Sequence, residues 1–215
     1  MPRARSAGLK AHLVEAADDL MDTIGPGSVT TRQIARHAAV SDGVLYNHFG
    51  DRGELVVAAL VRRYSRLVEA FEARLAEADE AREGTERPLG PWLHDFALAL
   101  RDLEAGALHL AAGIIAERRL LEAFWSEMHR APLGLDRLRR PLLDRLRTAR
   151  AAGLAAGDLD IEAAANLVFG ASLMSAITLR VNAHADRARI DRELAAAVDL
   201  VAGTLTGISA RGGMA

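Results

Sequence analysis

The sequence predicts an all-α protein in which an N-terminal three-helix helix-turn-helix domain precedes a larger helical domain. Half of the 215 residues are hydrophobic and 26% are charged, which is enough for a core in each domain. Apolar residues recur at helical spacing, and the chain is rich in Ala, Leu, Glu and Arg, which favour helices. We expect the first domain at residues 1–53, the second at 54–210 and a loose tail at 211–215.

Composition excludes several classes of protein. The chain has no cysteine, which rules out disulfide frameworks and thiolate metal sites. The N-terminus lacks the continuous apolar core of a signal peptide, and no apolar run reaches the roughly 18 residues of a membrane span. We therefore expect a cytoplasmic protein with no membrane partner. The net charge is −2, so any nucleic-acid interface must depend on where individual charges lie.

The first two helices have clear boundaries. Apolar residues from Leu9 to Ile24 fall on one face, and Gly25-Pro26-Gly27 then ends the helix. Thr30 or Thr31 can cap a second helix that runs to about Ala38.

Two further caps follow. Ser41 can cap a short third helix that continues through about Asn47. Asp51 can cap a long fourth helix, which carries an apolar stripe and is expected to run to about Ala81.

The rest of the chain also reads as helices, after a linker at residues 82–91 with the sequence REGTERPLGP. Helices are expected at residues 92–102, 106–129, 135–152, 161–183 and 189–208. Breaks are expected at residues 130–134 and 153–160.

Residues 31–47 have the pattern of a helix-turn-helix. The connection Ala39-Val40 is too short for the two helices to lie antiparallel, so they must cross steeply. The second helix of such a motif places its N-terminal residues on base edges in the major groove. Tyr46, Asn47 and His48 can donate hydrogen bonds to phosphate oxygens without any net charge. The pattern therefore predicts a DNA-reading helix that ends in a phosphate clamp.

The segment TTRQIARHAAVSDGVLYNHFGDRGEL, residues 30–55, resembles the DNA-binding segment of the TetR family of bacterial transcriptional repressors. The resemblance covers about residues 8–60. It is carried by TTR, Ile34-Ala35, Val40-Ser41, Leu45-Tyr46, His48-Phe49 and Arg52 with Leu55. It implies a homodimer, an operator of double-stranded DNA with an inverted repeat, and a C-terminal domain that dimerises and binds a small-molecule effector.

The resemblance also implies which residues contact DNA. Thr31, Arg32, Tyr46, His48 and Arg52 match family positions that touch DNA. Base readers are expected at Asp42, Gly43, Val44 and Asn47, and Ser41 completes the predicted DNA-binding set.

Three positions are unusual. Ala39 stands at the turn where the family usually has Gly, and a left-handed Ala would cost about 1 kcal/mol relative to Gly. Arg52 stands where Lys is commoner, which keeps the charge. Asp42 can accept a hydrogen bond from a cytosine N4 or can cap its helix and point away, and we favour the second interpretation.

Large apolar residues of the second domain, together with two histidines, are either ordinary core or the lining of a pocket for a small, mostly hydrophobic ligand. The candidates are Trp92, Phe96, Leu100, His109, Phe124, Trp125, Met128, His129, Phe169 and Met174.

Apolar and small residues also form stripes on the last two helices. Two such helices from each subunit would make a four-helix interface, although the stripes could equally cover their own domain's core. The candidates are Leu167, Gly170, Ala171, Ile177, Thr178, Leu194, Val198, Val201 and Leu205.

These observations favour a sequence-specific DNA-binding regulator, interpreted as a repressor that a ligand releases from its operator. One alternative is a regulator that is controlled by a protein partner or that activates transcription. Another is a helical enzyme or carrier with an incidental helix-turn-helix. Catalysis is the weakest interpretation because the sequence has no P-loop, dinucleotide fingerprint or nucleophile elbow. The scattered histidines predict no metal site, and we expect no cofactor.

Overall fold

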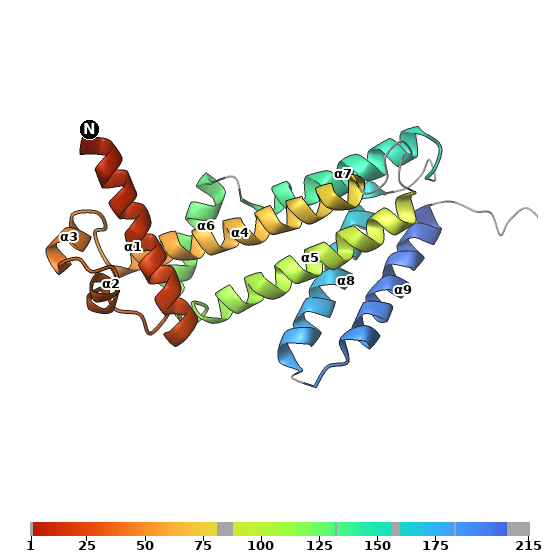
Figure 1. Cartoon of the computed structure of the whole chain (residues 1–215). Coiled ribbons are helices and arrows are strands. Elements are labelled where there is room, and N and C mark those ends of the chain that lie inside the picture. Colours follow the sequence, from red (N-terminus) through yellow and green to blue (C-terminus); the bar gives the residue numbers. More distant parts are fainter. Residues whose placement is uncertain (1, 81–87, 132, 156–159, 183, 206–215) are drawn as a thin grey trace, which may run out of the picture. The chain divides into compact units, whose positions relative to one another are not determined.

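The computed structural model describes residues 2–80, 88–131, 133–155, 160–182 and 184–205, without the side chains of residues 2–7, 80, 204 and 205. These ranges contain nine helices and no strand, which confirms the all-α class (Figure 1). The helices are α1 (Pro2–Ile24), α2 (Thr31–His37), α3 (Asp42–Tyr46), α4 (Arg52–Glu80), α5 (Leu89–Ala112), α6 (Arg118–Arg130), α7 (Leu135–Ala151), α8 (Ile161–Val181) and α9 (Arg187–Leu205).

The helices form two compact units. Unit 1 comprises residues 1–67 and 107–134, and unit 2 comprises residues 68–106 and 135–215. Helices α4 and α5 each contribute residues to both units. The predicted boundary at residue 53 separates a DNA-binding domain from a ligand-binding and dimerisation domain. That functional division stays a prediction. The predicted tail at 211–215 lies outside the described residues.

Helices α2, α3 and α4 begin where the sequence predicts. Thr30 forms a capping box with Gln33 at α2, because each side chain bonds the other residue's backbone N–H. The Ser41 hydroxyl accepts from the Val44 N–H at α3, and Asp51 Oδ1 accepts from the Glu54 N–H at α4 (2.8 Å). All three predicted capping residues are therefore confirmed.

The predicted arrangement of residues 92–129 is wrong in one respect. Helix α5 runs unbroken from Leu89 to Ala112, so no break occurs near residue 105, and the break falls instead at residues 113–117. Gly106 is tolerated inside the helix at a cost of about 1 kcal/mol. Gly113 is different because a Cβ there would lie 2.2 Å from Pro26 Cγ. That close approach places the break at the second glycine.

The core of unit 1 is built on α1. Leu13 of α1, Ile34 of α2 and Leu45 of α3 are completely buried, and Phe49 is 1% exposed. The ring of Phe124 on α6 meets that of Tyr64 on α4 edge to face, with centroids 6.3 Å apart. The packing of α2 against α1 and α3 holds these two short helices, which would not be stable alone.

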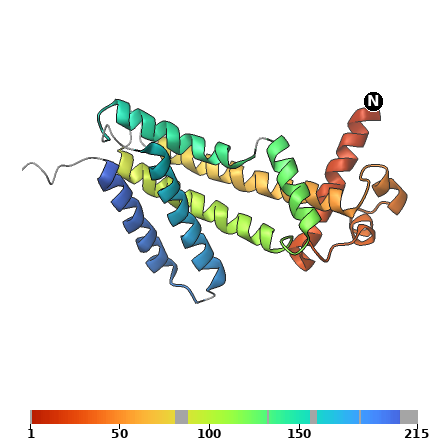
Figure 2. The same ribbon diagram turned by 180° about the vertical axis from the view of Figure 1, so that it is seen from behind.

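Unit 2 is a helical bundle around Phe96. Its ring contacts those of Phe71, Trp92 and Phe169, with centroids 5.2–6.2 Å apart. Helix α8 packs against both α7 and α9, and Figures 1 and 2 show α8 and α9 side by side. Arg101 is 1% exposed and pairs with Asp102 and Asp191, which satisfies its buried charge.

Helix α8 is long and apolar enough to cross a membrane, by length and composition alone. A single helix of this kind is weak evidence, because core helices have the same properties. One of its faces is buried within unit 2, where the Ser172 hydroxyl donates to the Ala97 carbonyl oxygen (3.2 Å). We interpret α8 as a packed helix of this bundle.

Glu104 of α5 makes the stability of unit 2 depend on pH. Burial raises the pKa of its carboxyl to about 8, and its Oε2 atom has no hydrogen-bond partner among the described residues. Between about pH 4.5 and pH 8 the folded chain retains a proton that the unfolded chain releases. Stability therefore falls as pH rises through this window, by at most about 1.4 kcal/mol per unit.

We expect Glu104→Gln to remove this dependence, because the amide carries no charge to desolvate. Urea unfolding at pH 5 and pH 8 measures the effect, with Glu122→Gln on the surface as control. An unchanged pH slope in Glu104→Gln would contradict the assignment.

Candidate nucleic-acid interface

Helix α3 presents one face to solvent. Asp42, Gly43, Tyr46 and Asn47 are exposed and Val44 is half-buried, whereas Leu45 turns completely into the core. This alternation follows from the 3.6-residue period of a helix whose inner face packs on α2. The predicted base-reading residues therefore share an accessible surface.

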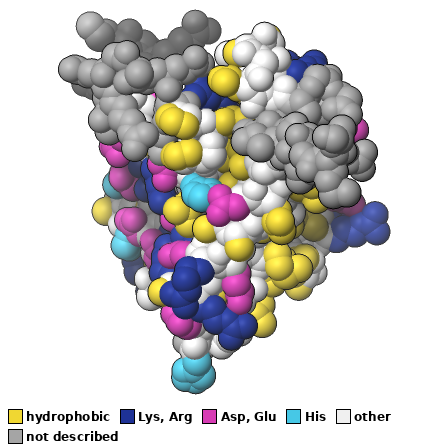
Figure 3. Space-filling view, turned by 90° about the vertical axis from the view of Figure 1, so that its right-hand side faces the viewer, with side chains coloured by type: hydrophobic (Ala, Val, Ile, Leu, Met, Phe, Trp, Pro, Cys, Tyr) yellow, Lys and Arg dark blue, Asp and Glu magenta, His cyan; other side chains and the backbone are white. Residues whose placement is uncertain are grey.

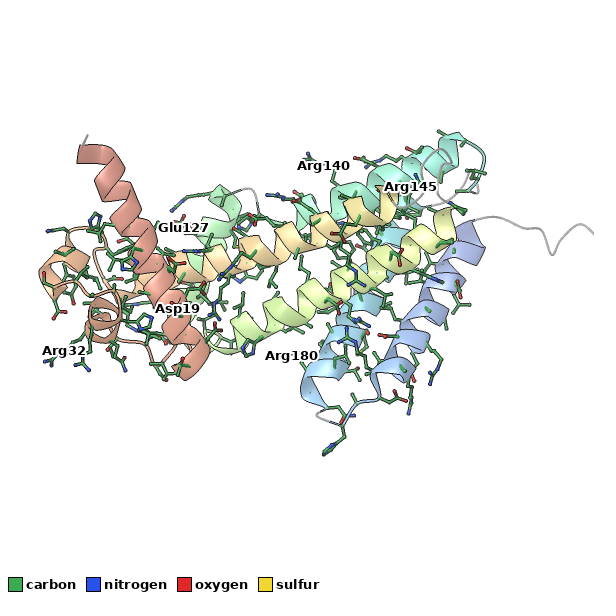
Figure 4. The ribbon with its side chains drawn as sticks, in the orientation of Figure 1. Asp19, Arg32, Glu127, Arg140, Arg145 and Arg180 are labelled. Carbon is green, nitrogen blue, oxygen red and sulfur yellow. The ribbon has the colours of Figure 1, made fainter. Side chains whose placement is uncertain are left out.

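The start of α2 lies beside the end of α3. The Thr31 hydroxyl and the Tyr46 hydroxyl are 3.3 Å apart, and the Tyr46 side chain is exposed. Arg32, the next residue on α2, is exposed and points away from the core (Figure 4). His48 is half-buried just beyond α3. The fold thus brings two hydroxyls together, with Arg32 and His48 one and two residues away along the chain, and all four side chains are suited to phosphate oxygens.

Asp42 does not cap its helix. Ser41 occupies the cap and accepts from the Val44 N–H (3.4 Å), while Asp42 is an exposed residue of the first turn. The capping interpretation of Asp42 is therefore wrong. Its carboxylate remains a candidate acceptor for a cytosine N4.

Arg52 is held inside unit 1. Its Nη2 donates to the carbonyl oxygens of Pro26 (2.6 Å) and Gly27 (2.8 Å), and its Nε donates to that of Val29. Its Nη1 lies 3.4 Å from Glu117 Oε2 at the start of α6. The guanidinium therefore fastens the turn before α2 to the start of α4. This arrangement favours a positioning role over the predicted phosphate contact.

The residues that hold Arg52 could not be recognised from the sequence. Glu117 is 65 positions away along the chain, and the other acceptors are backbone carbonyls. Only the conformation of the turn at residues 26–29 brings them together.

Ala39 is strained in the predicted way. Its φ is 54°, the left-handed region, and it is the one non-glycine residue with positive φ among the described residues. We expect Ala39→Gly to stabilise unit 1 by up to about 1 kcal/mol, because glycine adopts this conformation without a Cβ clash. Thermal unfolding followed by circular dichroism measures it.

Ala38→Gly is the matched control, since Ala38 has φ −76° and is 3% exposed. It should destabilise the protein. The strain argument is wrong if both glycine variants lose stability equally.

Comparison with known proteins agrees with this geometry. The family model described as "Bacterial regulatory proteins, tetR family" matches residues 13–59, from α1 into α4. Residues 13–59 of this chain therefore form a TetR-family N-terminal segment. The matched segment contains the capped helices, the strained turn and the exposed face of α3.

One curated relative is the HTH-type transcriptional repressor Rv3405c of Mycobacterium tuberculosis (strain ATCC 25618 / H37Rv). It is 31% identical over 102 residues, which are 47% of this chain and 51% of the relative. The chain thus spans about half the length of the curated relatives it matches.

Solved structures show the same fold over nearly the whole chain. A TetR-family regulator from Mesorhizobium loti superimposes with a TM-score of 0.73 and 19% identity, covering 94% of this chain and 98% of that one. RolR in complex with the ligand resorcinol superimposes with a TM-score of 0.55 and 21% identity, covering 92% of this chain and 89% of that one. These similarities establish the TetR-family fold for both units.

The predicted ligand-pocket residues are divided between the two units. His109, Phe124, Trp125, Met128 and His129 belong to unit 1. The remaining candidates, Trp92, Phe96, Leu100, Phe169 and Met174, belong to unit 2.

Burial separates the pocket candidates further. Phe96 and Leu100 are completely buried core residues, whereas Trp125 and Met174 are 51% and 63% exposed. The Trp125 backbone carbonyl accepts from His129 Nδ1 (2.7 Å), within a single turn of α6. A ligand pocket among these residues stays a prediction.

The predicted dimer residues fall into two groups. Leu194, Val198 and Val201 are at most 8% exposed, so they face the interior of unit 2. Leu167 and Gly170 are exposed, and Ala171, Ile177 and Thr178 are half-buried. The side chain of Leu205 lies outside the described residues.

The structure adds a further exposed leucine. Leu200 of α9 is 74% exposed, and it lines a groove of about 500 Å³ between α8 and α9 together with Leu167 and Gly170. Figure 3 shows hydrophobic side chains along one side of this end of unit 2 and charged ones along the other. Which of these residues contact a second subunit stays a prediction.

Proposed function

We propose that this protein is a homodimeric, sequence-specific DNA-binding regulator of the bacterial cytoplasm that represses transcription until a small ligand releases it from its operator. The exposed face of α3, with the Thr31 and Tyr46 hydroxyls 3.3 Å apart at its edge, is the observation that carries the proposal. We assign the protein no enzymatic activity.

The residues of the interface divide by role. Asp42, Gly43, Val44 and Asn47 lie along the accessible face of α3 and would meet base edges in the major groove. Ser41 precedes them as the cap of the reading helix. The phosphate contacts fall to Thr31, Arg32, Tyr46 and His48 at the flanks. Arg52 is assigned to positioning the elements that carry these groups.

A dimer with two-fold symmetry is expected because the DNA-reading helix α3 of one subunit is short. A five-residue helix contacts few base pairs, so a second copy is needed for a specific operator. The exposed leucines of α8 and α9 supply a surface for that copy. A dimer with two-fold symmetry would recognise an inverted repeat with half-sites about one helical turn apart.

Ligand control is supported by the solved relative RolR, which was crystallised with resorcinol, a small phenol. Helix α4 extends without interruption from Arg52 to Glu80 and therefore joins the reader to unit 2. A ligand can shift the DNA-binding equilibrium only through its different affinities for the two conformations. Near-complete release needs about 5.5 kcal/mol in total, shared between the two subunits.

Selection of bound duplexes from a random pool tests the proposal. We expect an inverted repeat to be enriched. Mobility shifts on that sequence should then separate the roles: Tyr46→Phe weakens binding to all sequences alike, whereas Asn47→Ala changes the preferred bases. Thr23→Ala, at the exposed end of α1, is the control and should leave binding unchanged. Failure to enrich any sequence would refute the proposed function.

A further inference from the structure

A groove of about 830 Å³ lies within unit 1, between α1, the start of α4 and α6. Its apolar lining includes Phe49, Val57, Val61, Leu120 and Ala123. It is larger than the groove of about 500 Å³ between α8 and α9, and none of the residues predicted to form the ligand pocket lines it.

Each acidic side chain of the groove already accepts a hydrogen bond. Asp51 accepts from the Glu54 N–H (2.8 Å), and Glu54 accepts from the Gly50 N–H (2.8 Å). Glu117 accepts from Arg52 and Glu127 from Arg130. Arginine side chains thus pair with Glu117 and Glu127, while backbone N–H groups hold Asp51 and Glu54.

Two cations of the groove are not matched. Lys10 lies with its Nζ 5.0 Å from the centroid of the Phe49 ring, and Arg119 is exposed on α6. Neither forms an ion pair with any side chain that the structure describes. An apolar groove with two such cations is complementary to an anion that carries a hydrophobic body.

We propose that this groove binds a small apolar carboxylate, whose charged end lies at Lys10 and Arg119 and whose hydrophobic body lies on Val57, Val61 and Leu120. A DNA phosphate could also use these cations. The small ligand fits better because the groove has an apolar floor, which a phosphate backbone would leave unused.

Binding here would bear on regulation, and that consequence rests on the proposed function. Arg52 and Glu117 both line the groove, and Arg52 also holds the turn before α2. A carboxylate in the groove would compete with Glu117 for the Arg52 guanidinium.

Calorimetric titration of the 215-residue protein tests the site without DNA. The probes are naphthalene-2-carboxylate and its neutral amide, naphthalene-2-carboxamide, which share one hydrophobic body. We expect the carboxylate to bind more tightly. Lys10→Gln and Arg119→Gln should each weaken the carboxylate by about 3- to 5-fold and leave the amide unchanged.

Two further variants complete the test. Arg118→Gln is the matched control, since Arg118 neighbours Arg119, pairs with Glu122 and lies outside the groove. It should leave both probes unaffected. Ala123→Phe places a ring in the groove from an exposed position and should weaken both probes. Circular dichroism of each variant verifies that it is folded.

Equal affinity for the carboxylate and the amide would overturn the proposal. So would equal losses in Arg118→Gln and Arg119→Gln. If Lys10→Gln and Arg119→Gln weaken operator binding but leave carboxylate binding intact, the cations serve DNA and the proposal is also overturned. Probe binding is measured without an operator, so it stands or falls separately from the proposed function.

Discussion

Replacing Leu167 and Leu200 together with aspartate is expected to separate the dimer and to lower operator affinity by at least about 100-fold. The two leucines are 61% and 74% exposed on α8 and α9, so the changes leave the core of unit 2 intact. In a two-fold interface every substitution occurs twice, which puts four carboxylates into an apolar contact. Each separated subunit would then bind one half-site of the operator alone, without the gain in affinity that a linked second subunit provides.

Sedimentation equilibrium and mobility shifts measure the two effects on the same preparations. The control is Leu154→Asp, an equally apolar position that is 56% exposed in the turn after α7. It should change neither the molecular mass nor the affinity. A double variant that remains a dimer would place the subunit interface elsewhere.

Arg52→Ala should destabilise unit 1 by about 2–4 kcal/mol. The side chain is 27% exposed, and its guanidinium donates to three backbone carbonyls and to Glu117. Removing it leaves those acceptors without a donor and frees the turn before α2. Operator binding should therefore weaken for every sequence, because the reading helix is less well positioned.

The variant Arg52→Lys distinguishes a positioning role of Arg52 from a direct contact with a DNA phosphate. A lysine keeps the charge but lacks the planar fork that reaches several carbonyls at once. We expect Arg52→Lys to lose nearly as much stability as Arg52→Ala, measured by urea unfolding, and neither variant to alter the salt dependence of operator binding. If Arg52→Lys instead restores affinity and Arg52→Ala lowers the salt slope by about one, Arg52 contacts a phosphate.

The sequence predicts the local structure well where a single residue type decides it. Thr30, Ser41 and Asp51 cap their helices because a short side-chain oxygen reaches the free N–H groups of the first turn. Ala39 adopts a positive φ because the turn between α2 and α3 demands it, whichever residue stands there.

Features that depend on distant partners are harder to predict from the sequence. The period of α9 marks Val198 as apolar but not whether its face meets α8 or another subunit, and the structure buries it. Composition could not separate Gly106 from Gly113, because only the second lies against Pro26. The groove at Lys10 and Arg119 depends on where α6 packs, and neither helix carries a local signal for that contact.

The discontinuity of unit 1 has a consequence for how the protein is made. Its first segment ends at residue 67, but the second, with Glu117, Leu120 and Phe124, begins at residue 107 and ends at residue 134. At ordinary rates of translation the ribosome adds the intervening and completing residues over about 3–13 s. During that interval the nascent chain exposes the apolar surface of α4 that α6 later covers. Unit 1 can therefore be completed only after residue 134 has been synthesised, although its helix-turn-helix lies near the start of the chain.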